Sequence, residues 1–375
     1  MNIRSRFIEL GIDSARLTEK KQQTNKKIEL VRDYVVRWAE ISAVRQDIQV
    51  ITFIDCMSNA GAYKDGDCCT SIEVLQVFCQ LAVRYPHKHF RVMCNDNDAE
   101  KIAILEKVAA NIVDCPANVQ VNTSSLDVNE YLAHLSKNPI IGNYNVFGYG
   151  CSTILYVDPY NFGTVEIPAI SSILEKYYCE LIFNFFTSDF TRNIKRDSGR
   201  IQKCLGGEAI TTLPGLFEYM RKMLRVGRIR YLFSYEFHIA NNVELYQIVF
   251  ATPNKLGLEK LKETLWKVFN GAEYHRNRKD LEQTSLFSDD YDQRLFLDNY
   301  AREAQSLLVQ YFNGQQLSFS EIEEFLIEYT MLGGTHIIDY VLKPMIASGQ
   351  VIKRGMVGSR NYKKDCYMIA VETSK

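Results

Sequence analysis

The sequence contains no pair of cysteines in the Cys-x-x-Cys arrangement. Its ten cysteines are scattered along the chain, and only Cys68 and Cys69 are adjacent. Zinc ribbons and iron–sulfur sites need closely spaced thiolates, so this pattern argues against both kinds of metal centre. Scattered thiols in a long chain are also typical of a reducing compartment. We therefore expect no metal ion and a cytoplasmic protein whose cysteines are reduced.

Long apolar runs and a net charge are missing as well. No stretch reaches the ~20 apolar residues that a transmembrane helix needs. The polar N-terminus does not have the pattern of a signal peptide, and we expect no membrane contact. The formal net charge is -1. Because the chain has no global basic field, any nucleic-acid site has to be a local basic patch.

Glycine is scarce where a dinucleotide-binding protein needs it. The loop after the first predicted strand holds one glycine, Gly61. The Gly-x-Gly-x-x-Gly fingerprint is therefore incomplete, which disfavours a plain nucleotide-binding oxidoreductase.

The stretch from Val50 to Phe78 is the first clear folding unit. An apolar, β-branched segment ends at Asp55, a small-residue loop follows, and apolar residues then recur at helical spacing. A continuous apolar run indicates a buried parallel strand, and a helix must carry the chain back across the sheet. Small loop residues let a ligand approach the backbone. The stretch alone fits either a nucleotide site or an ordinary strand–loop–helix unit.

Further strands follow, and most of them end in acidic or polar residues. They are a strand before Asp96 and Asp98, one at 119–121 before Asp127, one at 153–157 before Asp158, and one within 179–186. Two last strands join at Asn241-Asn242, a pair suited to a tight turn. The sequence therefore predicts an α/β fold: a Rossmann-like class I methyltransferase sheet whose parallel strands are closed by an antiparallel hairpin. Its ligand crevice lies at the strand carboxyl ends.

The domain organisation follows from composition. We expect a methyltransferase-like domain at 1–270, with an insertion at 187–226 near the mouth of the active site, and a polar, acidic linker at 271–292. Helical patterns then run from Arg294 to Phe312, from Ser320 to Tyr329 and from Thr335 to Ser348, where Gly349 stops the helix.

Residues 293–375 therefore predict a winged-helix-like domain with a two-stranded wing. Its basic residues are candidates for nucleic-acid binding: Lys353, Arg354, Arg360, Lys363 and Lys364. Many winged helices contact only protein, so both kinds of partner stay open.

Methyl transfer from S-adenosylmethionine needs a cleft that aligns the methyl group with a nucleophile. In such a cleft Asp96 is the candidate for the ribose hydroxyls, with Asp98 as the alternative. Asp127 would lie beside the adenine. Asp55 would lie near the amino-acid end of the cofactor, next to the loop that contains Asn59 and Gly61.

The sharpest motif is Asp158-Pro159-Tyr160. It resembles the Asp-Pro-Pro-Tyr loop of amino-methyltransferases. In that loop the acid and a prolyl carbonyl accept hydrogen bonds from an exocyclic amine, and the aromatic ring stacks on the flipped base. The alternative is a simple turn at Pro159 with a core aromatic after it.

Two groups of basic residues lie outside the wing. Arg192, in the expected insertion, is a further candidate for nucleic-acid binding. The lysines before the first long helix, Lys20, Lys21, Lys26 and Lys27, are interpreted as a solvated face, with phosphate binding as the alternative.

The order of these features resembles the three-Cys-motif partner proteins, a family with a methyltransferase-like domain. The resemblance covers about the first 290 residues, and its matching residues are the Tyr34…Trp38 helix, Ile54-Asp55 with Gly61, Asp158-Pro159-Tyr160, Phe183-Asn184-Phe185 with Arg192-Asn193, and the run from Leu245 to Phe250. The resemblance implies S-adenosylmethionine as the cofactor and a protein partner of the radical type that carries the cysteine motif. It also implies a phage-defence or mobile-element context.

One loop departs from that family. Where the family has Asp-x-Phe-Ala-Gly-Pro-Gly, this chain has Asn59 at the middle glycine and Ala60 at the proline. Asparagine tolerates positive φ better than other non-glycine residues, although its side chain adds bulk where the cofactor lies. Two functions stay open: a methyltransferase that acts on an amine of a nucleic-acid base, and a non-catalytic nucleic-acid-binding or partner protein that keeps the fold.

Overall fold

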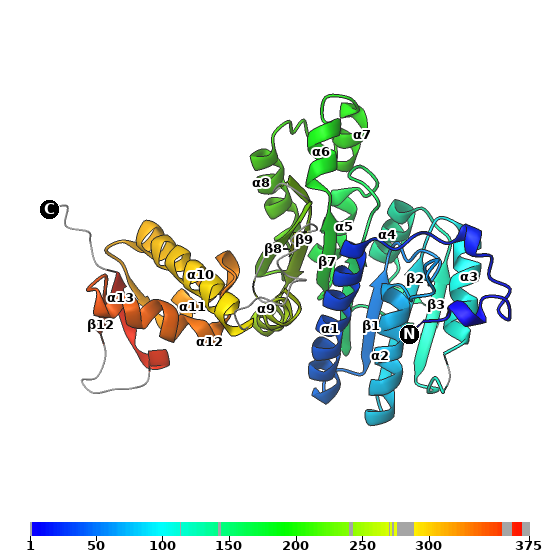
Figure 1. Ribbon diagram of the computed structural model, residues 1–375, viewed down its shortest axis with the longest axis horizontal. Helices are drawn as coiled ribbons and strands as arrows, with labels where there is room; N and C mark the ends of the chain where they lie inside the picture. The colour runs from blue at the N-terminus through cyan, green and yellow to red at the C-terminus, as the bar shows by residue number, and fades with distance from the viewer. Residues whose placement is uncertain are drawn as a thin grey trace. The chain divides into compact units, whose positions relative to one another are not determined.

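The structure is a computed structural model. It describes residues 2–112, 114–141, 144–239, 243–269, 271, 274–275, 289–354 and 362–369. The chain divides into two compact units, residues 1–254 with 274–277 and residues 255–273 with 278–375 (Figure 1). The turn predicted at Asn241-Asn242 and the wing residue Arg360 lie outside the described residues. Within the described residues, no helix is both long enough and apolar enough to cross a membrane.

The first unit is built on one sheet of strand order β10-β8-β9-β7-β6-β1-β2-β3. Its strands are β1 (Val50–Asp55), β2 (His89–Asn95), β3 (Val119–Ser124), β6 (Cys151–Val157), β7 (Glu180–Phe185), β8 (Tyr231–Ile239), β9 (Val243–Thr252) and β10 (Tyr274–His275). β7, β6, β1, β2 and β3 are parallel, and β9 runs antiparallel to both of its neighbours. The predicted class I methyltransferase sheet is confirmed. A separate short hairpin joins β4 (Ile140–Ile141) and β5 (Tyr144–Asn145).

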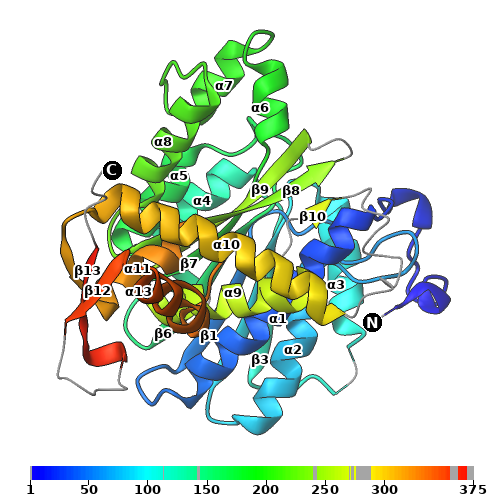
Figure 2. The same cartoon turned by 60° about the vertical axis from the view of Figure 1, so that its left-hand side comes forward.

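Helices cover both faces of this sheet. They are α1 (Gln22–Val44), α2 (Thr70–Arg84), α3 (Ala99–Ala110), α4 (Val128–Lys137), α5 (Ile167–Lys176), α6 (Thr187–Asn193), α7 (Ser198–Cys204) and α8 (Leu213–Leu224), with short 3₁₀ turns at Arg4–Arg6 and Ser14–Arg16. α1, α2 and α3 form one layer, and α4, α5 and α8 form the other (Figure 2). Every residue of β1 and β7 is buried. Coverage on both faces explains why these strands are continuous apolar runs.

The segment expected to be an insertion is partly a layer of the fold. α8 buries Leu216, Met220 and Leu224 in the same core as β7 and α5. α8 connects β7 to β8, two parallel strands with β9 between them, and such a crossover has to cover a face of the sheet. α8 is therefore a crossover helix, and only α6 and α7 are additions to the sheet and its layers.

The second unit begins earlier than the predicted linker. It contains α9 (Lys255–Phe269), α10 (Asp289–Phe312), β11 (Gln316–Ser318), α11 (Phe319–Tyr329), α12 (Gly334–His336), a π-helical turn (Ile337–Leu342), α13 (Lys343–Ala347), β12 (Val351–Arg354), a 3₁₀ turn (Tyr362–Lys364) and β13 (Cys366–Ile369). The expected two-stranded wing is a three-stranded antiparallel sheet, β11-β13-β12. Gly349 has φ +78 directly after α13, as expected of a helix stop.

α9 belongs to the second unit because it closes the end of α11. Lys262 is fully buried and donates to the carbonyl oxygens of Ile327, of Thr330 at 2.6 Å and of Leu332 at 3.0 Å. Trp266 donates from Nε1 to the carbonyl of Met331 at 2.9 Å. The last carbonyls of a helix have no partner within the helix, so α9 satisfies them from outside. The predicted boundary at residue 270 moves to residue 254 for this reason.

Replacing this lysine tests how α11 is held. Lys262→Met keeps an apolar stem but leaves buried carbonyls without donors, which costs at least about 2 kcal/mol of local stability. We expect hydrogen exchange of the amides in the last turn of α11 to become faster. Lys260→Met is the control, because Lys260 pairs with Glu263 near the surface of the same helix. Equal exchange in both variants would contradict this role of Lys262.

Candidate functional site

A cavity of about 410 Å³ lies at the carboxyl ends of β1, β6 and β7. Asp55 ends β1, Asp158 follows β6, and Asn184 lies near the end of β7. The segment from Thr18 to Lys27 lines the other side. β1 is flanked by β2 on one side and β6 on the other, so the cavity occupies the point where the strand order reverses, the usual ligand site of such sheets.

Asp158 is the most heavily bonded group in the cavity. Lys27 Nζ lies 2.7 Å from its Oδ1 and 2.5 Å from its Oδ2. Asn184 Nδ2 donates to Oδ1 at 2.7 Å, and the hydroxyl of Tyr156 donates to Oδ2 at 3.1 Å. An ionised carboxylate offers about four lone-pair positions. In this arrangement the predicted amine acceptor already has a donor at each of them.

Lys27 lies in the cavity rather than on the solvated face that the sequence predicts, and it is 8% exposed. The Lys20 ammonium is likewise paired, with Asp65 and Asp67. The signal was present in the helical spacing. Lys27 precedes the buried Val31 and Tyr34 by four and seven residues, so all three share the inner face of α1. A buried cation on an apolar helix face needs an anion beside it, and Asp158, whose side chain is 22% exposed, provides it.

Asp55 is buried at the floor of the cavity. Its Oδ2 accepts from the Ser71 hydroxyl at 2.5 Å, and its Oδ1 accepts from the backbone N–H of Met57 at 3.1 Å. Burial raises the pKa of Asp55 to about 7, against the lowering effect of these two hydrogen bonds, and the nearby Asp158 and Asp96 raise it further. The side chain can therefore exchange a proton near neutral pH when a cation arrives.

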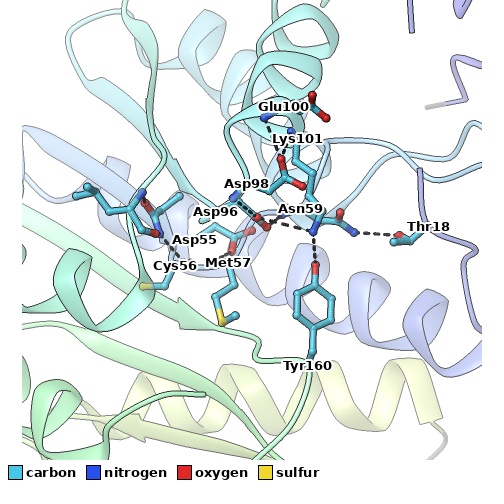
Figure 3. A network of polar contacts seen from close by, with 12 residues as sticks. Thr18, Asp55, Cys56, Met57, Asn59, Asp96, Asp98, Glu100, Lys101 and Tyr160 are labelled. Carbon is cyan, nitrogen blue, oxygen red and sulfur yellow. Dashed lines mark hydrogen bonds and ion pairs between the residues drawn. The ribbon is translucent and has the colours of Figure 1, made fainter. Parts of the chain in front are cut away.

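The loop after β1 is shaped by Asn59 and Asp96 (Figure 3). Asn59 has φ +60, the left-handed conformation that a glycine usually supplies. Its backbone N–H donates to Asp96 Oδ2 at 3.1 Å, and its side chain donates to the Thr18 hydroxyl at 3.1 Å. Asp96 Oδ1 also accepts from the backbone N–H of Asp98 at 3.0 Å. Asp96, 3% exposed, thus holds the loop from beneath.

Tyr160 reaches across this loop to α3. Its hydroxyl lies 3.4 Å from Lys101 Nζ, and the same ammonium is 5.2 Å from its ring centre. Lys101 also lies 3.7 Å from Asp96 Oδ1. The ring is 55% exposed at the edge of the cavity. An exposed aromatic ring beside a cation can accept a stacked planar group.

Three side chains that line the cavity each carry an amide oxygen that is buried without a hydrogen-bond partner in the described part of the chain. They are Gln23 Oε1, Asn59 Oδ1 and Asn184 Oδ1. Buried polar atoms are normally bonded. Three open acceptors in one cavity therefore point to a ligand that brings N–H or O–H donors.

The predicted site residues divide into two sets. Asp55, Asn59, Asp158, Pro159 and Tyr160 line the cavity together. Three others do not line it: Gly61, Asp96 and Asp127.

Each residue of the second set has a local structural role. Gly61 has φ +80, and a Cβ there would lie 3.1 Å from the Leu105 Cα. Asp127 caps α4 by accepting from the backbone N–H of Asn129 at 2.9 Å, and Asp98 caps α3 in the same way.

The predicted nucleic-acid residues are spread over both units. Arg192 is exposed on α6 and lies 3.8 Å from Asp189. In the second unit Lys353 pairs with Asp365 at 2.8 Å and lies 4.3 Å from the centre of the Tyr362 ring. Arg354, Lys363 and Lys364 are exposed. The wing is therefore less basic at its surface than its sequence indicates.

Comparison with known proteins gives similar folds at low identity. No protein-family model matches the sequence, and no curated protein matches it. A DUF519-family protein from Legionella pneumophila str. Philadelphia 1 is 11% identical, with a TM-score of 0.39 over 66% of this chain and 94% of that one. The magnesium protoporphyrin IX methyltransferase of Synechocystis PCC 6803, with bound SAH, is 13% identical, with a TM-score of 0.32 over 67% and 98%.

A small RNA methyltransferase is 11% identical, with a TM-score of 0.33 over 60% of this chain and 26% of its own. Likenesses at this level give no information about individual residues of the cavity. The chemistry of the cavity therefore rests on its own residues.

Titration of Asp55 gives a test of the cavity floor. Its pKa is raised on folding, so the folded state binds more protons than the unfolded state between about pH 4 and pH 7. Stability must then fall as the pH rises through this window. We expect Asp55→Asn to lose the part of this slope that Asp55 contributes in urea unfolding measured from about pH 5 to pH 8, with a ceiling of about 3 kcal/mol on the difference.

Glu180 serves as the internal reference in this experiment. Burial raises its pKa to about 7 as well, and it is unchanged in both proteins. Subtracting the two pH profiles therefore isolates Asp55. Parallel profiles for the two proteins would show that Asp55 ionises normally.

Proposed function

We propose that the protein is an S-adenosylmethionine-dependent methyltransferase that acts on an amine of a nucleic-acid base. The observation that carries this proposal is the cavity at the switch point of the sheet, which is lined by Asp55, Asp158 and three residues with unpartnered amide oxygens. Its volume is in the range of small-molecule sites. A parallel sheet closed by an antiparallel hairpin is the methyltransferase variant of the Rossmann-like fold.

The residues present fit the amino-acid end of the cofactor. An α-ammonium group needs acceptors, and Gln23 and Asn59, which line the cavity with Asp55, each carry an unpartnered oxygen. When bound, the cofactor supplies an electrophilic methyl group on a sulfonium. Asp96 then acts through Asn59, by fixing the loop that faces the cofactor, rather than as a group of the cavity wall.

The acceptor side is Asp158 with Asn184. A neutral amine needs no prior deprotonation if its lone pair is aimed at the methyl group, so the required groups are hydrogen-bond acceptors that orient it. Asn184 Oδ1 is open, whereas Asp158 is occupied by the Lys27 ammonium. The incoming amine therefore has to displace Lys27 from at least one carboxylate oxygen, and Tyr160 would stack on the base beside it.

The Lys27–Asp158 pair also supports a second candidate function. If the Lys27 ammonium stays on Asp158, no amine can bind to that carboxylate. The protein is then a non-catalytic nucleic-acid-binding or partner protein. The side chain of Asn59 in the cofactor loop favours the same alternative. Substitution of Lys27 distinguishes the methyltransferase from the non-catalytic protein.

The second unit is proposed to be a winged-helix-like module. Its order of helices and its antiparallel sheet support this proposal. Because Lys353 is already paired, nucleic-acid contact there falls to Arg354, Lys363 and Lys364. A protein partner with a cysteine motif, and a role in phage defence, stay proposals from the family resemblance alone.

Substitutions at the ion pair test the acceptor site. We expect Asp158→Ala to abolish methyl transfer and to leave cofactor affinity within about twofold, because the lost group is on the substrate side. We expect Lys27→Met to raise kcat/KM for the acceptor, since it frees one face of Asp158. The assay is transfer of tritiated methyl groups to bulk DNA, tRNA and rRNA, with calorimetry for the cofactor.

The matched control is Lys26→Met, one residue earlier on α1, where the side chain is half-exposed and pairs with Glu29. It should behave like the wild type. Cofactor binding without transfer in the wild type and in Lys27→Met would replace the enzyme by the non-catalytic candidate. Full activity of Asp158→Ala would remove this residue from the site.

Protonation of Asp55 gives a test of the cofactor end. A cation bound near Asp55 favours the ionised carboxylate, so binding below pH 7 must release protons. We expect calorimetry at about pH 6, in buffers with different ionisation enthalpies, to show release of up to about one proton. Asp55→Asn should bind without this release. Equal proton release in the wild type and in Asp55→Asn would mean that the cation does not bind near Asp55.

A further inference from the structure

Helices α6 and α7 concentrate positive charge that the chain as a whole lacks. Between Thr187 and Cys204 there are five Lys or Arg residues and two Asp residues, whereas the whole chain has 44 basic and 45 acidic residues. The two helices lie side by side directly after β7 (Figure 1). Because β7 ends at the cavity, its continuation into α6 places this charge at the same edge of the sheet.

Of the two acidic side chains in this segment, Asp189 holds the loop after β6, and Asp197 caps α7 and pairs with Arg200. Asp189 Oδ2 accepts from the backbone N–H of Phe162 at 3.0 Å, and Asp189 Oδ1 accepts from Asn193 at 2.7 Å. On α7, the Cys204 thiol lies 3.0 Å from the carbonyl oxygen of Val165. α6 and α7 are therefore held by hydrogen bonds to the loop that begins with the Asp158-Pro159-Tyr160 motif.

Four of the five basic side chains are exposed, whereas Arg200 is half-buried and pairs with Asp197. Lys195 and Arg196 are exposed, and no ion pair engages either of them among the described residues. Arg192 is 69% exposed and Lys203 is 76% exposed, and each has only a loose acidic neighbour, at 3.8 Å and 3.3 Å. Exposed pairs of this kind contribute little. These cations can therefore exchange their neighbours for other anions at small cost.

We infer that α6 and α7 form the surface that holds the phosphate backbone of a nucleic acid while one of its bases reaches the cavity. This inference rests on the proposed function and names the substrate-binding surface of the same site. Among the described residues, no large apolar side chain is exposed between 187 and 204. Protein interfaces and membrane-bound helices need apolar anchors, whereas a phosphate backbone needs cations and polar groups.

The neighbouring Tyr160 supports the same partner. Its ring is exposed at the mouth of the cavity, on the loop that α6 and α7 hold. Cations that follow a backbone next to an aromatic ring on which a base stacks are the usual pair of features in single-strand binding sites.

The test compares two double variants with equal change in charge. The first is Lys195→Glu with Arg196→Glu, both exposed and both in the segment that follows β7. The control is Lys107→Glu with Lys137→Glu, which lie in the last turns of α3 and α4. Crossover helices run opposite to the strands, so these two lysines are at the far edge of the sheet.

Binding of fluorescently labelled single-stranded RNA and DNA to the full chain is measured by anisotropy over a range of salt. We expect the first variant to weaken binding at least about tenfold and to lower the salt slope by about 1 to 2. The control should bind like the wild type. Comparing the RNA and DNA arms identifies which backbone is held.

Several outcomes would overturn the inference. Equal loss in both variants would mean that only net charge matters, and unchanged binding in the first would place the nucleic acid elsewhere. No binding in the wild type at low salt would favour an acidic protein partner. Because this assay contains no cofactor, a protein that fails to bind S-adenosylmethionine but loses nucleic acid on charge reversal would refute the proposed function alone.

Discussion

Partnering of the buried and half-buried carboxylates at the strand ends is the constraint on which the rest of the structure depends. A parallel sheet brings the ends of β1, β2 and β6 to one edge, and each ends in or precedes an acid. A carboxylate out of water needs hydrogen bonds or a counter-charge. Asp55 accepts a hydrogen bond from Ser71, Asp96 accepts one from the backbone N–H of Asn59, and Asp158 pairs with Lys27. These contacts fix the elements that carry the partners, which are α2, the loop after β1 and α1.

The same partnering makes the cavity selective. Asp55 sits at a pKa where an arriving cation can ionise it, while Asp158 is already neutralised by an internal ammonium. The cavity therefore has two different carboxylates. Asp55 ionises when a cation binds, whereas at Asp158 a ligand must compete with Lys27. Open oxygens on Gln23, Asn59 and Asn184 favour a ligand that is rich in donors. A cofactor with an ammonium group and an acceptor with an amine share this property.

Outside the cavity, too, the partners of the acidic side chains decide which charged groups face solvent. In α6 the acid Asp189 is turned inward to hold the loop after β6, which leaves the cations of that segment facing solvent. In the second unit Asp365 pairs with Lys353, whereas Arg354, Lys363 and Lys364 are exposed. Which cations of a basic segment face solvent thus depends on where its acids lie. Net charge along the chain does not reveal this, because it depends on which acids are used in packing.

The sequence by itself determined the sheet, its closing hairpin and the acids at the strand ends, because apolar runs, helical spacing and turn residues are local signals. Asn59 was expected to tolerate a positive φ, and it adopts one. Tertiary structure alone decided the partner of each acid. Lys27 and Asp158 are 131 residues apart, so no local pattern pairs them. The same holds for α8, which became a layer of the sheet, and for α9, which joined the second unit because the carbonyls at the end of α11 needed a donor.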